Sequence, residues 1–161
     1  MFATLPKAER IVLPALTAAD VMTPNPMSLR AEATVAEAVA SLTDRGFGAA
    51  PVIDVAGRPV GVLSGTDLLL HDREHMTHTT VGDDLDDLPE GFGFEEADPT
   101  VVADIMTPAV FAVGPDMPIG EVVGHMLALR VHHLFVIDKG GALVGVISPL
   151  DVLRHLKNET A

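Results

Sequence analysis

The chain has 161 residues and a formal net charge of −13, from 10 basic and 23 acidic residues. Proteins that bind nucleic acid or an anionic membrane surface cluster Lys and Arg, so we expect neither kind of partner. The absence of cysteine excludes disulfides, thiolate catalysis and cysteine-ligated zinc. The sequence has no run of 18 apolar residues and no signal-peptide pattern, so we expect a soluble cytoplasmic protein.

In chain order, residues 1–17 form an N-terminal arm in which Pro6 and Pro14 limit regular structure. Its apolar residues favour docking onto the body of the protein, and the alternative is contact with a partner chain. Hydrophobic residues make up 48% of the chain but aromatic residues only 4%. We therefore expect a core of closely packed aliphatic side chains.

A first set of elements is expected within residues 18–71. Thr34 and Glu37 form a capping-box pattern that predicts the start of a helix. Gly46 suits the left-handed residue that ends it. Two apolar runs around a glycine-containing turn then predict a hairpin with strands at 52–55 and 60–63.

A second helix is expected to begin after Ser64, with Ser64 or Thr66 as its cap. Residues 72–101 follow as a linker or insertion, and residues 71–100 hold ten of the acidic residues. Such a composition cannot bury enough apolar surface to fold alone, so we interpret the segment as solvated and mobile.

The same order of elements returns within residues 102–161. A helix is expected to start at Asp116, with Pro118 tolerated in its first turn. Two strands and a last helix follow, at 134–137, 143–147 and 150–157. Each half thus reads strand–helix–strand–strand–helix, and one such unit is too small to bury its sheet alone.

An internal duplication underlies this repetition. The motif Gly-x-x-Ser-x-x-Asp occurs at 61–67 and again at 145–151, which is 84 positions later. The same offset relates two further pairs of segments: 20–24 with 104–108, and 51–54 with 135–138. Three matches in one register, without a net insertion, indicate two copies of one structural unit.

These doubled motifs resemble a tandem pair of cystathionine β-synthase (CBS) domains, a Bateman module. The resemblance assigns repeat 1 to 18–71 and repeat 2 to 102–161. It implies an α+β fold in which two βαββα repeats pack sheet to sheet with pseudo-two-fold symmetry. It also implies a homodimeric regulatory module, not an enzyme and without a required cofactor. Its ligand would be AMP, ADP, ATP or S-adenosylmethionine, bound in clefts between the repeats, and its effector protein is not identified by the sequence.

The repeated motif has a chemical interpretation of its own. Asp67 and Asp151 stand at the start of a helix, where a carboxylate can accept two hydrogen bonds from a ribose diol. The hydroxyls of Ser64 and Ser148 can reach ribose or phosphate, and Thr66 joins this candidate set. The alternative is ordinary helix capping by these Ser and Asp residues, which is compatible with ribose binding.

A second candidate group lies in repeat 2, at Arg130, His132 and His133. The resemblance implies that basic residues here contact phosphates; the alternative for each histidine is a merely buried or surface position. At the same offset repeat 1 has small neutral residues: Gly46, Gly48 and Ala49. We therefore expect the two clefts to differ, with phosphate favoured by repeat 2.

The resemblance also places Met27 and Val110 near the purine, and the alternative is plain core packing. A separate set, His71, His75 and His78, has spacings of four and three that could ligate zinc or nickel on one helix face. Neighbouring threonines weaken a helix there. We therefore favour a solvated loop and no metal.

Two functions compete on this sequence. The first is a non-catalytic sensor of an adenine nucleotide, in which binding changes the conformation or assembly that a partner detects. The second is a structural dimerisation module with empty clefts. An enzyme is disfavoured, because no nucleophile–base pair, metal-ligand motif or phosphate-binding glycine loop appears at useful spacing.

Overall fold

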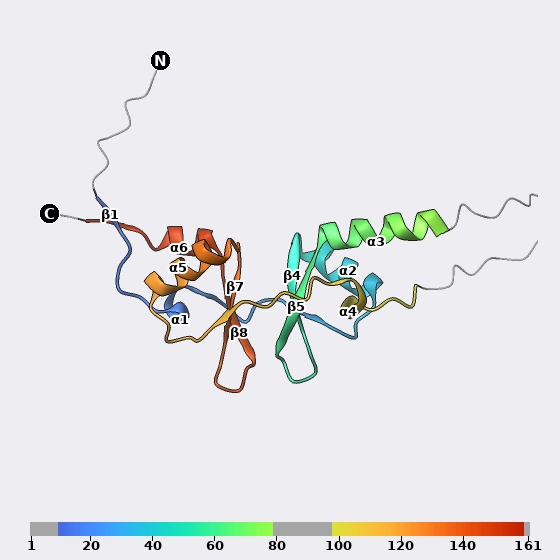
Figure 1. Cartoon of the computed structure of the whole chain (residues 1–161), viewed down its shortest axis with the longest axis horizontal. Coiled ribbons are helices and arrows are strands. Elements are labelled where there is room, and N and C mark those ends of the chain that lie inside the picture. The colour runs from blue at the N-terminus through green and yellow to red at the C-terminus, as the bar shows by residue number, and fades with distance from the viewer. Residues whose placement is uncertain (1–9, 79–97, 160–161) are drawn as a thin grey trace, which may run out of the picture. The chain divides into compact units, whose positions relative to one another are not determined.

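Figure 1 presents the structure, a computed structural model that describes residues 10–78 and 98–159. The chain forms two compact units. The repeat 1 unit is Met27–Ala109, and the repeat 2 unit combines Met1–Pro26 with Val110–Ala161. Each unit therefore holds the body of one repeat and the short segment that leads into the other. We call residues 17–24 and 101–108 the lead-in segments.

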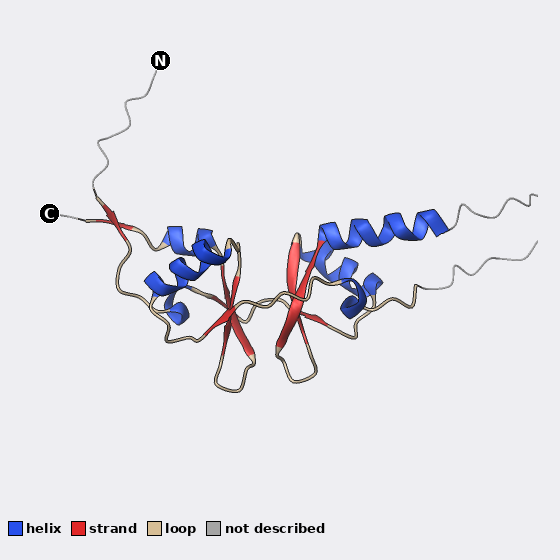
Figure 2. Cartoon of the chain, viewed as in Figure 1, coloured by secondary structure: helices blue, strands red, loops and turns tan. Residues whose placement is uncertain are grey.

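The body of the repeat 1 unit is a three-stranded sheet in the order β3-β4-β5 (Figure 2). Strand β3 is parallel to β4, whereas β4 and β5 form an antiparallel hairpin. The elements are β3 Leu29–Arg30, α2 Val35–Arg45, β4 Ala49–Ile53, β5 Pro59–Ser64, α3 Gly65–His78 and, from the lead-in segment, α4 Val102–Ile105.

The repeat 2 unit has the same order of elements around a sheet in the order β2-β8-β7-β6. Strand β2 belongs to the lead-in segment and pairs antiparallel with β8; the matching contact in the other unit is the bridge of Thr107 with Val62. The elements are α1 Ala18–Val21, β2 Thr23–Pro24, β6 Ala112–Val113, α5 Ile119–Leu129, β7 Leu134–Ile137, β8 Leu143–Ile147 and α6 Pro149–Arg154. The fold is thus the expected α+β pair of βαββα repeats.

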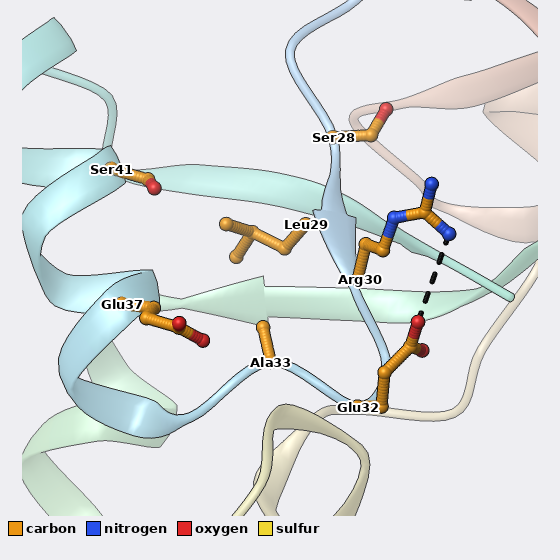
Figure 3. Close-up of a pocket in the computed structure, with 7 residues that line it drawn as sticks. All are labelled: Ser28, Leu29, Arg30, Glu32, Ala33, Glu37 and Ser41. Atoms are coloured by element: carbon orange, nitrogen blue, oxygen red, sulfur yellow. Dashed lines mark ion pairs between the residues drawn. The ribbon is translucent and has the colours of Figure 1, made fainter. Parts of the chain in front are cut away.

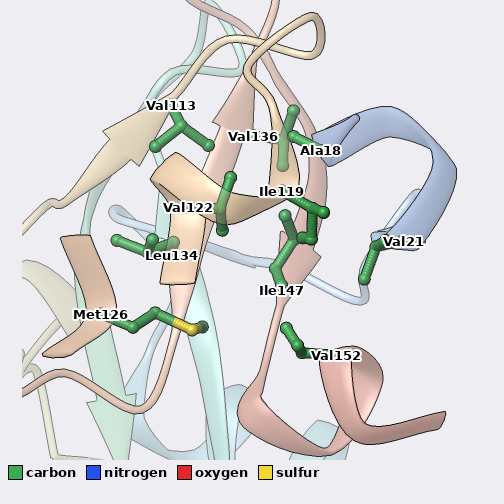
Figure 4. Packing of buried hydrophobic residues seen from close by; sticks show 10 residues of the cluster. All are labelled: Ala18, Val21, Val113, Ile119, Val122, Met126, Leu134, Val136, Ile147 and Val152. Carbon is green, nitrogen blue, oxygen red and sulfur yellow. The ribbon is translucent and has the colours of Figure 1, made fainter. Parts of the chain in front are cut away.

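Each unit has its own aliphatic core, as the composition predicts. In the repeat 2 unit, Val122 of α5 and Leu134 of β7 are almost completely buried in a cluster that includes residues of α1 (Figure 4). In the repeat 1 unit, Val102 of α4 is fully buried with Val52 and Leu63. The lead-in segments are therefore part of the cores.

The glycine that opens each repeated motif has a packing function. A Cβ on Gly61 would lie 2.6 Å from the carbonyl oxygen of Thr107 and 2.8 Å from Met106 Sδ. A Cβ on Gly145 would collide with the side chain of Met22. The Met-Thr-Pro segment of one repeat thus crosses the strand of the other at its glycine, and any side chain there would push the two apart.

Local signals account for several element ends. The Thr34 hydroxyl accepts a hydrogen bond from the Glu37 N–H at 3.2 Å, and Glu37 Oε2 accepts one from the Thr34 N–H at 2.9 Å. The helix ends at Gly46 with φ of 66°. The predicted capping box and left-handed end are both confirmed. Asp54 and Asp138, which repeat at one offset, each accept two backbone N–H groups of their hairpin turn.

Two predicted helix ends in repeat 2 are wrong. Helix α5 begins at Ile119, because Pro118 keeps an extended ψ of 138° as its N-cap; it does not start at Asp116. Helix α6 ends at Arg154 and not at 157, since β9 (Lys157–Asn158) pairs with β1 (Ile11–Val12) instead.

The loop expected after residue 71 is also wrong, because α3 continues to His78. The low helix propensity of threonine is a weak signal. The contacts of His71 and His75 with Asp98, described below, support the additional turns of α3. The hairpin of repeat 1 is confirmed, but β4 runs from Ala49 to Ile53, and Val55 lies exposed in the turn.

The described part of the arm docks onto the repeat 2 unit. Leu13 and Leu16 pack against its core, and Arg10 forms an ion pair of 3.3 Å with Glu159 beside the β1–β9 ribbon. Docking is therefore confirmed for residues 10–16. The acidic segment 79–97 and residues 1–9 lie outside the described ranges, so their expected behaviour stays a prediction.

Candidate functional site

The Ser–Asp pair of each motif forms the same reciprocal cap. Asp67 Oδ2 accepts hydrogen bonds from the Ser64 N–H at 2.8 Å and from its hydroxyl at 2.7 Å, while the hydroxyl accepts the Asp67 N–H at 3.3 Å. The corresponding distances for Asp151 and Ser148 are 2.8, 2.8 and 3.3 Å. The capping interpretation is therefore confirmed, and it uses Oδ2 of each carboxylate.

The other carboxylate oxygen faces a threonine of the lead-in segment. Thr107 donates to Asp67 Oδ1 at 3.2 Å, and Thr23 donates to Asp151 Oδ1 at 3.5 Å. Sequence reasoning did not assign these threonines. Their signal was present, because each is the middle residue of a doubled Met-Thr-Pro motif. Each candidate site thus combines an aspartate of one repeat with a threonine from the lead-in segment of the other, and both residues lie in the same unit.

The two aspartates differ in their surroundings. Asp151 is buried, with 9% of its surface exposed, and Arg154 Nη1 lies 3.7 Å from its Oδ1. Asp67 is only partly buried, and the position equivalent to Arg154 is the exposed Leu70. Among residues 10–78 and 98–159, the repeat 2 carboxylate therefore has a cation at its side and the repeat 1 carboxylate forms no ion pair.

Arg130 occupies a strained position in the repeat 2 unit. It ends α5 with φ of 54°, in the left-handed region where repeat 1 has Gly46. A residue with a Cβ costs roughly 1–2 kcal/mol there. The Arg130 side chain is exposed and forms no ion pair with any residue in the ranges 10–78 and 98–159. Such local strain is typical of positions kept for a function.

His132 and His133 are both exposed residues of the segment before β7. Partial desolvation and the nearby charge of His132 lower the pKa of His133, and Asp151 opposes this shift. His133 therefore lies within electrostatic range of the buried carboxylate. A bound anion would raise its pKa again and favour the charged imidazolium.

The other predicted residues divide between the units. Met27 belongs to the repeat 1 unit and packs against its core, as the core-packing alternative expects. Thr66 lies exposed in the first turn of α3, whereas Ser64 is the cap. Val110 belongs to the repeat 2 unit and is 37% exposed.

Each unit also has a shallow depression at an equivalent place, and neither is lined by a predicted site residue. The one of about 400 Å³ is drawn in Figure 3, where Arg30 faces Glu32 across an ion pair of 3.7 Å. Its lining is Ser28, Leu29, Arg30, Glu32, Ala33, Glu37 and Ser41. The other, of about 510 Å³, is lined by residues that include Asp116, Glu121 and Asp138. Carboxylates outnumber the single cation of each lining, Arg30 in the first and Lys139 in the second, which disfavours phosphate.

A further polar cluster lies on α3. His71, which is buried, places Nε2 at 2.6 Å from Asp98 Oδ2, and His75 Nε2 lies 3.8 Å from the same oxygen. The hydrogen bond from His71, followed by two from Thr100, holds the pKa of Asp98 well below its usual range. The side chain of His78 lies outside the described part of the chain.

Comparison with known proteins defines the family. The CBS domain model matches residues 18–74 and 102–158, so the chain belongs to the CBS domain family and carries two copies of the domain. None of the helices within the described ranges is long and apolar enough to cross a membrane.

Two curated relatives match most of the chain. The chloroplastic CBS domain-containing protein CBSX2 of Arabidopsis thaliana is 28% identical over 157 residues, which cover 89% of this chain and 66% of that protein. An uncharacterised protein of Methanopyrus kandleri is 23% identical over 135 residues, which cover 84% of this chain and 57% of the relative. The chain thus spans less than two thirds of the length of either relative.

A solved structure of CBSX2 in complex with AMP has the same fold. It is 26% identical to this chain, with a TM-score of 0.64, and the match covers 86% of this chain and 94% of that one. The similarity extends over both repeats and is therefore a similarity of the whole CBS pair.

Proposed function

We propose that the chain is a non-catalytic regulatory module that binds an adenine nucleotide, and that phosphorylated nucleotides bind more tightly in the repeat 2 unit than in the repeat 1 unit. Membership of the CBS family and the AMP complex of CBSX2 support a nucleotide ligand. The observation that carries the difference is the buried Asp151 with Arg154 at 3.7 Å and His133 nearby. Repeat 1 has Leu70 and Ala49 at these two positions, so it lacks both the guanidinium and the titratable imidazole.

In this proposal, Asp151 binds the ribose diol through Oδ1. Its Oδ2 is held by Ser148, so the carboxylate is oriented before the ligand arrives. The Thr23 contact of 3.5 Å is long for a hydroxyl donor and leaves Oδ1 able to accept a stronger one. Ordering the site in advance lowers the entropic cost of binding.

The phosphates are assigned to Arg130, His132 and His133. Arg130 is exposed without a carboxylate partner among the described residues, and a guanidinium binds phosphate in a bidentate geometry. On a protein with a net charge of −13, such a local cation group is what allows an anion to bind. Val110 is the candidate for contact with the purine in this unit, and Met27 in the other.

We propose further that the chain is a homodimer whose helices α3 and α6 take part in the interface. Leu69 of α3 is 71% exposed and Leu153 of α6, at the equivalent position, is 59% exposed. Apolar residues exposed at the same place in both repeats suit an interface that uses both copies. Ligand binding would then change the conformation or stability of the dimer, which an effector protein detects.

The second candidate is a structural module whose sites stay empty. It is favoured by the fact that Ser64 and Asp67, like their partners in repeat 2, already satisfy each other as helix caps. Both motifs would then be explained by folding alone.

One experiment separates the two functions. Purified protein is titrated calorimetrically with AMP, ADP, ATP, S-adenosylmethionine and NAD, and its mass is measured by light scattering. Tight binding of a phosphorylated nucleotide supports the sensor. A folded dimer that gives no heat with any ligand supports the structural module and overturns the proposed nucleotide function.

A further inference from the structure

We propose that His71, His75 and Asp98 form a site for a divalent late first-row metal ion, with Zn²⁺ as the expected occupant. The site lies wholly within the repeat 1 unit. It is distinct from the nucleotide residues proposed above. It rests on the convergence of three side chains from two separate parts of the chain.

The continuation of α3 brings the two histidines together. His71 and His75 are four residues apart, so they lie one turn apart on one face of the helix. Their ring centroids are 4.3 Å apart in an edge-to-face arrangement. The segment that precedes α4 then brings Asp98 to this face, where its Oδ2 lies 2.6 Å from His71 and 3.8 Å from His75.

The spacing of the donor atoms suits coordination. One ligand atom from each residue lies within 4.8 Å of the others. A tetrahedral zinc ion with bonds of about 2.0–2.1 Å holds its ligand atoms roughly 3.3 Å apart. The 2.6 Å contact would open by about 0.7 Å and the 3.8 Å contact would close by about 0.5 Å. The two histidine nitrogens, which lie within 4.8 Å of each other, would close by up to about 1.5 Å, and side-chain rotations supply these changes. Two imidazoles and a carboxylate are a donor set that zinc uses, with a fourth position left for water or another ligand.

The carboxylate is already oriented for this role. Asp98 Oδ1 accepts a hydrogen bond from the Thr100 N–H at 3.0 Å, which turns Oδ2 toward the histidines. Hydrogen bonds that orient a ligating carboxylate are a regular part of metal sites. The backbone that follows is fixed in turn, because the Thr100 carbonyl accepts the Val35 N–H at 3.1 Å.

The equivalent place in the repeat 2 unit lacks these features. His155 corresponds to His71, but its Nδ1 contacts the Asp151 carbonyl at 2.7 Å, and the position equivalent to His75 is Glu159, which pairs with Arg10. Metal binding would therefore be a property of one unit, and it would fasten the end of α3 to the segment before α4.

A simple hydrogen bond between His71 and Asp98 is the competing explanation, and His75 distinguishes the two. The hydrogen bond does not need His75, whereas the metal does. Both His75 and Asp98 are partly exposed, with side-chain exposures of 58% and 34%, so their conservative variants should fold. His125, an exposed histidine of α5, provides the matched control.

The test uses the untagged full chain, stripped with a chelator and titrated with Zn²⁺ by calorimetry and with Co²⁺ by visible absorption. We expect one ion per wild-type chain. His75→Gln and Asp98→Asn should each weaken binding by at least about tenfold, whereas His125→Gln should bind as the wild type does. Absence of stoichiometric binding by the wild type, or unchanged affinity in His75→Gln and Asp98→Asn, would overturn the site. AMP titration of His75→Gln should match the wild type, so this result is independent of the nucleotide proposal.

Discussion

The two units share one backbone plan but differ in the charges around their aspartates. Each has the reciprocal Ser–Asp cap, a threonine donated by the other repeat's lead-in segment, and a glycine at the crossing. Within the described part of the chain, only the repeat 2 unit adds Arg154 beside its aspartate. It also has Arg130, with its backbone in the left-handed region, where repeat 1 has Gly46. The cap, the threonine and the glycine, which the fold uses, are therefore present in both units. The side chains suited to phosphate are present in the repeat 2 unit.

The positions that match in the two units differ in kind from the positions proposed to bind the phosphates of the ligand. Positions that match in both units, such as Gly61 and Gly145, are explained by packing alone. Positions that differ, such as Arg130 against Gly46, are not required by the fold, because the other unit forms without them. Variants at matched positions should therefore change stability, and variants at differing positions should change binding.

The largest effect on stability is expected from Gly61→Ala. Its new Cβ would meet the Thr107 carbonyl, which belongs to the backbone, so the lead-in segment must shift. We expect a loss of about 1–3 kcal/mol in the free energy of unfolding, measured by denaturant titration. Gly145→Ala should cost less, because it meets the flexible Met22 side chain. Gly124→Ala on α5 is the control, since nothing lies within 4 Å of its Cβ. An equal loss of stability in Gly61→Ala and Gly124→Ala would contradict the close packing of the lead-in segment against Gly61.

A smaller and opposite effect is expected from Arg130→Gly. Removing the Cβ relieves the left-handed strain, and the greater freedom of the unfolded chain offsets part of this gain. We expect a net stabilisation of about 0.5–1 kcal/mol together with weaker binding of AMP. Gly46→Ala is the matched reverse change and should destabilise without affecting AMP. Loss of stability in Arg130→Gly would show that the arginine has a structural role instead.

The smallest effect concerns pH. The pKa of His133 is lower in the folded protein than its ordinary value of 6.5. The unfolded chain therefore binds more protons, so His133 contributes stability above about pH 6.5 that is lost as the pH falls through its folded pKa. His133→Gln should flatten this slope in thermal unfolding between about pH 5 and 7, whereas His132→Gln retains most of it. An unchanged slope in His133→Gln would contradict the assignment.

Much of the fold could be predicted from the sequence because the signals were local. The capping box of Thr34, the glycine at residue 46 and the strands of repeat 2 depend on neighbours within a few residues. The exchange of lead-in segments could not be predicted in this way, since it depends on packing between residues as distant as Met22 and Gly145. The predicted end of the last helix failed for a related reason, because β9 is defined by its pairing with β1. The predicted start at Asp116 failed for a local reason, because Pro118 keeps an extended ψ as the N-cap of α5.

The candidate sites show the same limit. The repeated motif predicted Ser148 and Asp151 as candidate ligand-binding residues. The residue types at the positions of Arg130, His132 and His133 predicted that the two repeats differ. Arg154 was missed because it lies one helical turn beyond Asp151. Thr23 was missed because it lies 128 residues before Asp151 in the chain. Asp98 was likewise outside the histidine set, for which the sequence analysis favoured a solvated loop and no metal, and only the folded chain brings Asp98 to α3.

The most direct test of the central claim is calorimetric titration of AMP into the wild type, Asp151→Asn and Asp67→Asn. Each variant alters the equivalent Ser–Asp cap of its own unit, so the free energies of unfolding of the two variants provide a matched control for folding. A charge-assisted hydrogen bond contributes about 1.5–3 kcal/mol, so Asp151→Asn should weaken the tight site by roughly 10- to 150-fold. Asp67→Asn should leave it within about threefold of the wild type. Equal losses in both variants, or a loss in Asp67→Asn alone, would contradict the proposed difference between the units.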